Sequence, residues 1–351
     1  MPPGSSPSVS SSTVEQRPKY RQILLASTNP VEFFLRDARL RVALLAAGIG
    51  LATFLTYVTG GTRTAMPQIF YVVIFVGGFW FGPRGGLLAG LISGLAVGPL
   101  MPINVDEATR QATANWVLRL GIFTSVGYIT GWLVAGLRRR VDDLSTLSAQ
   151  SIRSFVRTID FKSTYTAQHS EKVAEYAVQI ARAMDLPNAD VERIYWAGLL
   201  HDVGKIRIPR TVLDKPARLD VREMAMIRHH PLYSLEILKG IDEFERFLPA
   251  IRSHHERWDG QGYPDGIAGE DIPFDGRVLA VADAFDAMTS NRPYRTALTA
   301  EEACDELRRN AGTQFDPNIV DAFLARREIR VFGEETGFIA SAGDWKAANE
   351  T

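Results

Sequence analysis

Four apolar segments in the first half of the chain restrict its fold more than any other feature. They cover residues 42–58, 69–81, 86–101 and 120–137. A transmembrane helix needs about 20 consecutive apolar residues, and the first and last segments come close to that length. In lipid the backbone must satisfy its own hydrogen bonds, so such segments form helices. We therefore predict a four-helix transmembrane domain over residues 39–137, with three helices as the alternative.

Charged residues predict how this domain is oriented. Asp106 and Glu107 lie between the third and fourth segments. Arginines precede the first segment, occupy the turn after the second and follow the fourth: Arg36, Arg39, Arg41, Arg84, Arg138, Arg139 and Arg140. Because positive charge accumulates on the cytoplasmic side, we expect a multi-pass membrane protein with both termini in the cytoplasm. An even number of spans agrees with this orientation.

The segments around the membrane domain have different compositions. Residues 1–38 are rich in Ser and Pro and predict a disordered tail. Residues 138–150 predict a connecting helix, in which Val141 and Leu144 begin a broken heptad pattern that suggests a homodimer. Residues 151–328 are predicted to form a second domain, followed by a polar tail over residues 329–351. In the third apolar segment glycine recurs every four residues, which predicts close packing of helix backbones.

The second domain has helical periodicity almost throughout, so the fold class is predicted to be all-α. Thr299 and Glu302 form a capping box, and Asp316 precedes a proline that can begin a helix. The net charge of −1 argues against binding of a nucleic-acid polymer. The single cysteine, Cys304, excludes an intramolecular disulfide.

All six histidines of the chain lie in this second domain, from residue 169 onward. His201-Asp202 is followed by Gly204-Lys205, and His254-His255 opens a segment that ends in Gly262-Tyr263-Pro264. Imidazole and carboxylate groups are the usual protein ligands of catalytic zinc, manganese and iron. Their concentration in one domain predicts a dinuclear metal site.

The segments His201-Asp202 and Gly262-Tyr263-Pro264 resemble the two signatures of the HD-GYP family. The resemblance extends from about residue 151 to 324 and implies an all-helical HD-type hydrolase domain. Members of that family hydrolyse cyclic di-GMP with two or three metal ions, commonly iron or manganese. The metal ligands implied here are His201, Asp202, His230, His254, His255 and Asp283, with Asp202 bridging the ions.

His169 is a possible additional ligand by the same resemblance. Some members bind a third ion through a glutamate four residues before this histidine, where this chain has Tyr165. We therefore expect two divalent ions, iron or manganese. His229 lies beside the matched His230 and is expected at the surface or in contact with a ligand. Asp286 is expected to support the fold or the ligands.

For the substrate, the resemblance implies contacts from Tyr263, Arg292 and Arg295. Lys205, three residues after Asp202, is expected to neutralise the transition state or assist the leaving oxygen. The predicted activity is hydrolysis of cyclic di-GMP to pGpG, with further cleavage to GMP as an option. The alternatives are a receptor that binds a cyclic dinucleotide without turnover, and a phosphodiesterase for another cyclic dinucleotide such as cyclic GMP-AMP. In each case the membrane domain would act as the sensor, and the resemblance implies the inner membrane of a bacterium.

Overall fold

The computed structural model describes residues 37–162, 168–291, 296–325, 329–330 and 339–340. Backbone contacts divide the chain into two compact units, with the division between residues 150 and 151. The described elements are α2 (Ala38–Val58), η3 (Met66–Ile69), α3 (Phe70–Val97), α4 (Thr113–Asp160), α5 (His169–Ala183), α6 (Asn188–Leu200), η4 (Val203–Arg207), α7 (Arg210–Leu213), α8 (Val221–Arg228), α9 (His230–Leu238), α10 (Asp242–Glu245), α11 (Leu248–Ser253), η5 (Gly269–Asp271), α12 (Phe274–Thr289), α13 (Ala300–Arg309), α14 (Pro317–Leu324), β1 (Ile329–Arg330) and β2 (Ile339–Ala340). The fold is all-α apart from the two-residue antiparallel pair β1–β2.

Three helices of the described chain are long and apolar enough to cross a membrane, where the sequence predicted four. The difference arises because the second and third apolar segments join in α3 without a loop. The helix breaks at Gly82, whose φ of 67° and ψ of −157° suit glycine alone, and Pro83 follows at once. A Cβ built on Gly77 would lie 2.7 Å from the Cβ of Ala89, so the two halves of α3 pack against each other as a hairpin.

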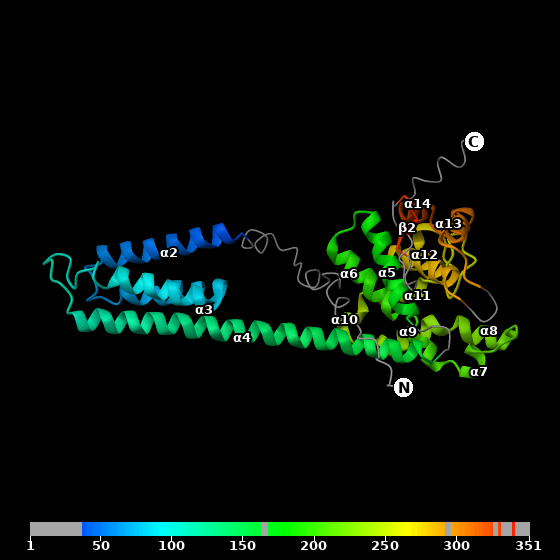
Figure 1. The fold of residues 1–351 in the computed structure, drawn as a ribbon, viewed down its shortest axis with the longest axis horizontal. Helices are drawn as coiled ribbons and strands as arrows, with labels where there is room; N and C mark the ends of the chain where they lie inside the picture. Colours follow the sequence, from blue (N-terminus) through cyan, green and yellow to red (C-terminus); the bar gives the residue numbers. More distant parts are fainter. Residues whose placement is uncertain (1–36, 163–167, 292–295, 326–328, 331–338, 341–351) are drawn as a thin grey trace, which may run out of the picture. The chain divides into compact units, whose positions relative to one another are not determined.

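The connections at the two ends of α3 confirm that the chain doubles back. Thr62 donates its backbone N–H to Pro102 at 3.2 Å, and Val105 donates to Gly60 at 3.3 Å. A straight α3 would hold these connections apart by its whole length. Instead α2, the two halves of α3 and the start of α4 lie side by side (Figure 1). The second and third apolar segments therefore lie antiparallel, although both belong to one helix.

Glycines bring these helices into backbone contact, as the four-residue spacing predicted. A Cβ on Gly86 would overlap the carbonyl of Gly127 on α4, and a Cβ on Gly90 would overlap that of Phe123. The buried apolar core here is small: Ala52, Phe70, Ile74, Val97 and Phe123. Many large apolar side chains point outward instead, including Phe54 and Trp132, which are 61% and 62% exposed. Exposed apolar surface of this extent suits contact with lipid.

The second unit is built around α12. Phe285 on α12 makes edge-to-face contacts with Tyr176 on α5 and Phe323 on α14, at centroid distances of 4.9 and 5.1 Å. Helices α5 and α6 approach closely because a Cβ on Gly198 would lie only 2.9 Å from the Cα of Ala174. The predicted caps at Thr299 and Asp316 are confirmed, since each side chain accepts a backbone N–H of the following helix. This packing brings the ends of α5, α6, α9 and α11 together.

Candidate metal centre

Three histidines at helix ends share one local geometry. The Nδ1 atoms of His201, His230 and His254 each lie 2.6–2.7 Å from the carbonyl oxygen three residues earlier. Each Nδ1 therefore carries the proton and donates it to the backbone, which leaves the Nε2 lone pair free. His201 and His254 follow α6 and α11, whereas His230 begins α9. The helix ends thus fix both the orientation and the tautomer of three potential ligands.

The free Nε2 atoms converge. Those of His230 and His254 are 3.2 Å apart, although both are acceptors by the argument above. Two lone pairs at this distance repel each other unless a cation lies between them. The distance also equals the separation of two ligands on one ion with metal–nitrogen bonds of about 2.0–2.1 Å. The buried Nε2 of His201 has no hydrogen-bond partner in the described chain, a further indication that a metal ion fits here.

Two groups of ligand atoms that share no residue can each hold a metal ion, and a third, formed by His201, Asp202 and His254, overlaps both. One consists of His230, His254 and His255, and the other of His169, His201 and Asp283; within each group the ligand atoms lie within 4.8 Å of one another. Asp202 lies between the groups. Its Oδ1 is 3.1 Å from Nε2 of His230, and its Oδ2 is 3.3 Å from Nε2 of His201. One carboxylate oxygen therefore faces each group, which is the arrangement of a bridging ligand.

His169 belongs to this cluster through α5, whose first residue it is. Its Nε2 is 3.3 Å from Asp283 and 3.5 Å from Asp202, and its Nδ1 is 2.6 Å from Oδ2 of Asp286. Ser290 donates its hydroxyl to the other oxygen of Asp286 at 3.2 Å. Asp286 therefore orients His169 as the backbone carbonyls orient the other histidines.

Charge in the buried cluster follows from its neighbours. Burial alone would raise the pKa of Asp202, but His201 and Lys205 hold it well below its usual range, and Lys205 Nζ lies 2.5 Å from Oδ2. Burial would lower the pKa of His169, yet the surrounding carboxylates raise it well above the ordinary value. Burial lowers the pKa of His255 to about 3. The cluster thus combines ionised carboxylates with a neutral His255, the protonation states that metal ions require, whereas His169 would have to lose its proton to bind an ion.

The segment after His255 folds tightly onto it. Glu256 is buried and accepts the backbone N–H groups of Asp265 and Gly266 at 2.6 and 3.1 Å. A Cβ on Gly262 would lie 2.5 Å from the Cα of Glu256, so only glycine fits there. The ring of Tyr263, which precedes a cis proline, stacks on His255 at a centroid distance of 4.8 Å.

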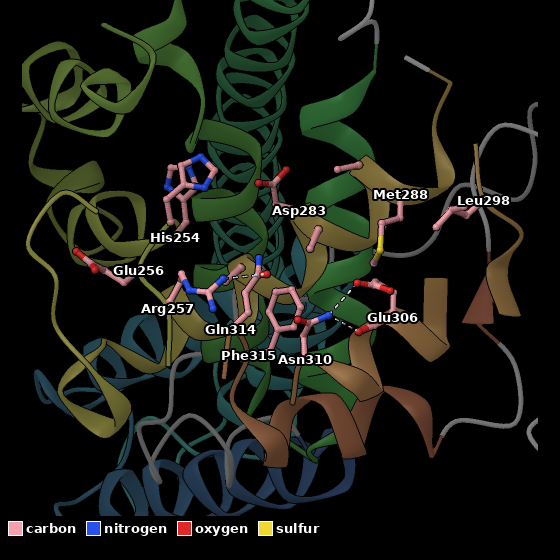
Figure 2. Close-up of a pocket in the computed structure, with 14 residues that line it drawn as sticks. His254, Glu256, Arg257, Asp283, Met288, Leu298, Glu306, Asn310, Gln314 and Phe315 are labelled. Atoms are coloured by element: carbon pink, nitrogen blue, oxygen red, sulfur yellow. Dashed lines mark hydrogen bonds between the residues drawn. The ribbon is translucent and has the colours of Figure 1, made fainter. Parts of the chain in front are cut away.

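A pocket of about 690 Å³ begins at these ligands. Figure 2 shows His254 and Asp283 at one end and Gln314, Asn310 and Glu306 at the other. Apolar residues also line it: Ala280, Ala284, Ala287, Met288, Leu298 and Phe315. The volume lies within the range of about 300–1,000 Å³ that is usual for small-molecule sites.

The structure brings together all the metal ligands expected from the sequence, including the additional candidate His169. Lys205 contacts Asp202, and Tyr263 contacts His255. Arg292 and Arg295, expected to bind substrate, lie outside the described residues, as does Tyr165. His229 packs against Tyr233 rather than in the cluster.

Some residues that shape the site were not singled out from the sequence. The hydroxyl of Ser234 accepts from the N–H of Gly204 and donates to the carbonyl of His201, both at 2.9 Å. Gln314 and Asn310 line the far end of the pocket. No local motif marks these residues, because they reach the site from other helices and turns.

The part of the chain that carries these residues is similar to a known family of proteins. Residues 153–319 match the family model described as HD domain. The chain carries an HD domain. A cyclic di-GMP phosphodiesterase of Vibrio cholerae is 31% identical over 265 residues, which cover 69% of this chain and 52% of that protein.

Two further relatives match the HD domain over shorter stretches. The cyclic di-GMP phosphodiesterase response regulator RpfG of Xanthomonas campestris is 38% identical over 192 residues, or 53% of this chain and 50% of that protein. The 3'3'-cGAMP-specific phosphodiesterase 3 of Vibrio cholerae is 39% identical over 166 residues, or 47% of this chain and 36% of that protein. The chain thus spans about half or less of the length of these relatives.

Proposed function

We propose that this chain is a membrane-bound, metal-dependent phosphodiesterase that hydrolyses cyclic di-GMP to pGpG. The observation that carries the proposal is Asp202, whose two carboxylate oxygens face two separate groups of ligands. Two-metal sites are typical of enzymes that hydrolyse phosphodiesters. Relatives named cyclic di-GMP phosphodiesterases support the choice of substrate.

The ligand groups would hold two divalent ions, for which we propose iron or manganese. His230, His254 and His255 would bind one ion, and His169, His201 and Asp283 the other. Asp202 would lie between the two ions. Bound ions would supply Lewis acidity and an activated water for attack on phosphorus. The mixed nitrogen and oxygen donors suit either metal.

The protein residues would then orient the substrate and balance its charge. Lys205 keeps Asp202 ionised by direct contact, and its remaining N–H groups can donate to a phosphoryl oxygen. Tyr263, whose ring stacks on His255, is the proposed substrate contact next to this ligand. The apolar wall of the pocket would exclude water from the reacting phosphate. We retain Arg292 and Arg295 as proposed substrate contacts.

The test uses the full-length chain, purified without air in detergent and loaded with Mn²⁺ or Fe²⁺. Cyclic di-GMP should be converted to pGpG, and Asp202→Ala should abolish turnover. Glu301→Gln, an exposed change on α13, is the control. Tight binding of cyclic di-GMP without turnover by the metal-loaded parent would favour a receptor instead.

Specificity for cyclic GMP-AMP is the second candidate function. One of the relatives that match the HD domain of this chain is named 3'3'-cGAMP-specific phosphodiesterase 3. The two substrates are separated by their kcat/KM values with the same preparation. A preference of more than tenfold for cyclic GMP-AMP would replace cyclic di-GMP as the proposed substrate.

We further propose an inner-membrane location with both termini in the cytoplasm. Each half of α3 is roughly 20 Å long at about 1.5 Å per residue, shorter than a hydrocarbon core of about 30 Å. Whether the hairpin crosses the core or dips into it, α2 and α4 run in opposite directions, so their cytoplasmic ends share one side. Labelling of a cysteine introduced at Arg140 in intact cells and in inverted vesicles tests the orientation; reaction in intact cells would contradict it.

Signals from the membrane would reach the metal centre through the end of α4. Ser170, the residue after His169, donates its hydroxyl to Asp160 at 2.8 Å. Arg157 binds Glu171 through two hydrogen bonds of 2.9 and 3.1 Å. The last turn of α4 is therefore fixed to the first turn of α5 on the residues that follow His169. A displacement of α4 would move that histidine.

A homodimer through α4 completes the proposal. Val141, Leu144 and Leu147 are 60–66% exposed on the connecting part of this helix. Burying such apolar surface against a second copy is favourable. Disulfide crosslinking of Leu144→Cys should trap a dimer, with exposed Thr146→Cys on the opposite face as the control; equal crosslinking of both would contradict a specific interface.

A further inference from the structure

The pocket that begins at the metal ligands ends in a group of hydrogen-bonding side chains with unused capacity. Arg257 donates Nη1 to Oε1 of Gln314 at 3.2 Å (Figure 2). Because Arg257 fixes the amide oxygen, the Nε2 group of Gln314 is left as a donor. Among the described residues it has no hydrogen-bond partner. Arg257 is itself held by Asp259 at 2.6 Å, so the amide is oriented in advance.

The neighbouring side chains present acceptors. Asn310 uses its Nδ2 group to donate to the backbone and side-chain oxygens of Glu306, both at 2.9 Å (Figure 2). Its Oδ1 therefore remains as an acceptor that no other described residue uses. The Glu306 carboxylate also pairs with Arg309 at 2.6 Å, but a carboxylate has about four acceptor positions and can take further donors.

The space between this polar end and the ligands suits a flat ring. Ala284, Ala287 and Met288 from α12 form part of one wall, and Leu298 and Phe315 contribute further apolar surface. Alanine side chains leave room along the helix, and Phe315, which is 4% exposed, adds an apolar contact at the pocket wall. A phosphate at the ligands and a nucleobase at the polar end would thus occupy the two ends of one pocket.

We propose that the Gln314, Asn310 and Glu306 end of the pocket is a guanine-binding subsite that selects cyclic dinucleotides containing at least one guanine. The inference rests on the proposed function, since it identifies the base next to the cleaved phosphate. The Watson–Crick edge of guanine carries one acceptor, O6, and two donors, N1–H and N2–H. The subsite carries the complement, with one free donor on Gln314 and free acceptors on Asn310 and Glu306.

Adenine does not match this pattern. Its corresponding edge has a donor at N6, an acceptor at N1 and no donor at C2. Adenine would leave at least one acceptor of the subsite unpaired and would place its own N1 lone pair towards an oxygen. A site built to bond a donor rejects analogues that lack it, because the polar groups that the bound base covers then remain unpaired. Cyclic di-GMP and cyclic GMP-AMP each contain a guanine, whereas cyclic di-AMP contains none.

The test compares kcat/KM of the full-length, Mn²⁺-loaded chain for cyclic di-GMP, 3'3'-cGAMP, cyclic di-AMP and the base-free ester bis(p-nitrophenyl) phosphate. Gln314→Glu replaces the free donor by an acceptor and keeps the contact with Arg257. Glu306→Gln removes the charged acceptor. Glu301→Gln, exposed on the same helix α13, is the matched control. Equilibrium binding of the three dinucleotides is measured on the same preparations.

The parent should process both guanine-containing substrates at least tenfold better than cyclic di-AMP. Each subsite variant should lower kcat/KM and affinity for the guanine-containing substrates about tenfold, the size of one lost hydrogen bond to a charged group. Cleavage of the base-free ester should stay unchanged.

Equal processing of cyclic di-AMP by the parent, or unchanged preference in both variants, would overturn the subsite. Failure of the parent to cleave even the base-free ester would reject the proposed phosphodiesterase activity. In that case the binding ratio between cyclic di-GMP and cyclic di-AMP still decides the subsite.

Discussion

Replacing Asp286 by asparagine should selectively weaken one of the two proposed metal sites. Oδ2 of Asp286 lies 2.6 Å from Nδ1 of His169, and Ser290 donates to Oδ1. In Asp286→Asn, the amide oxygen is expected to stay with the Ser290 hydroxyl, which turns the NH₂ group towards His169. Nδ1 must then accept a hydrogen bond, so the proton moves to Nε2. A protonated Nε2 cannot bind a metal ion.

The size of the effect follows from two independent considerations. A hydrogen bond to a charged group contributes about 1.5–3 kcal/mol, which corresponds to roughly 10- to 100-fold in an equilibrium constant. Mutation of a residue that orients a metal-bound histidine typically costs about 10- to 100-fold in metal affinity. We therefore expect a loss of this size for the ion held by His169, His201 and Asp283. The ion held by His230, His254 and His255 should bind as before.

Metal content per chain and competition with a chelating dye measure the two affinities. Asp275→Asn is the control, since Asp275 is also a buried carboxylate on α12 but pairs with Arg193 at 2.5 Å. It should lower stability without changing metal affinity. Retention of two ions of parental affinity in Asp286→Asn would refute the reasoning, as would an equal loss in Asp275→Asn.

Three further predictions concern stability. Gly204→Ala should lower the free energy of unfolding by roughly 1–3 kcal/mol, because its Cβ would overlap the carbonyl of His230; an unchanged denaturation midpoint would contradict this. Without metal, burial alone would lower the pKa of His169, but the surrounding carboxylates raise it. Protonated His169 therefore stabilises the folded state fully below about pH 6.5, and this stabilisation is lost as the pH rises through the raised pKa. The unfolding temperature measured against pH should show this loss, and the pH dependence should disappear in His169→Gln. The same pH profile in the variant as in the parent would contradict this prediction. Gly86→Leu should reduce the yield of monodisperse protein in detergent, since Gly86 contacts Gly127 on α4, whereas Gly121→Leu, with open space where its Cβ would lie, should not. Equal yields would argue against the packing of α3 on α4.

The sequence predicted most of the local structure because local structure follows from local patterns. Helical periodicity, the caps at Thr299 and Asp316 and the apolar segments each depend on neighbouring residues. The number of membrane helices was less certain for the same reason. Gly82 and Pro83 reverse the chain within one continuous apolar stretch, and only the contact of Gly77 with Ala89 distinguishes a hairpin from a long helix.

The residue types of the metal centre were also evident from the sequence, since histidine and aspartate side chains determine which ions can bind. Their arrangement was not, because it depends on contacts between helices far apart in the chain. Only the folded structure places the two oxygens of Asp202 between two groups of ligands, sets Asp286 against His169, and brings Gln314 to the far end of the pocket. The sequence thus determined which chemistry is available, and tertiary packing decided which atoms can act together.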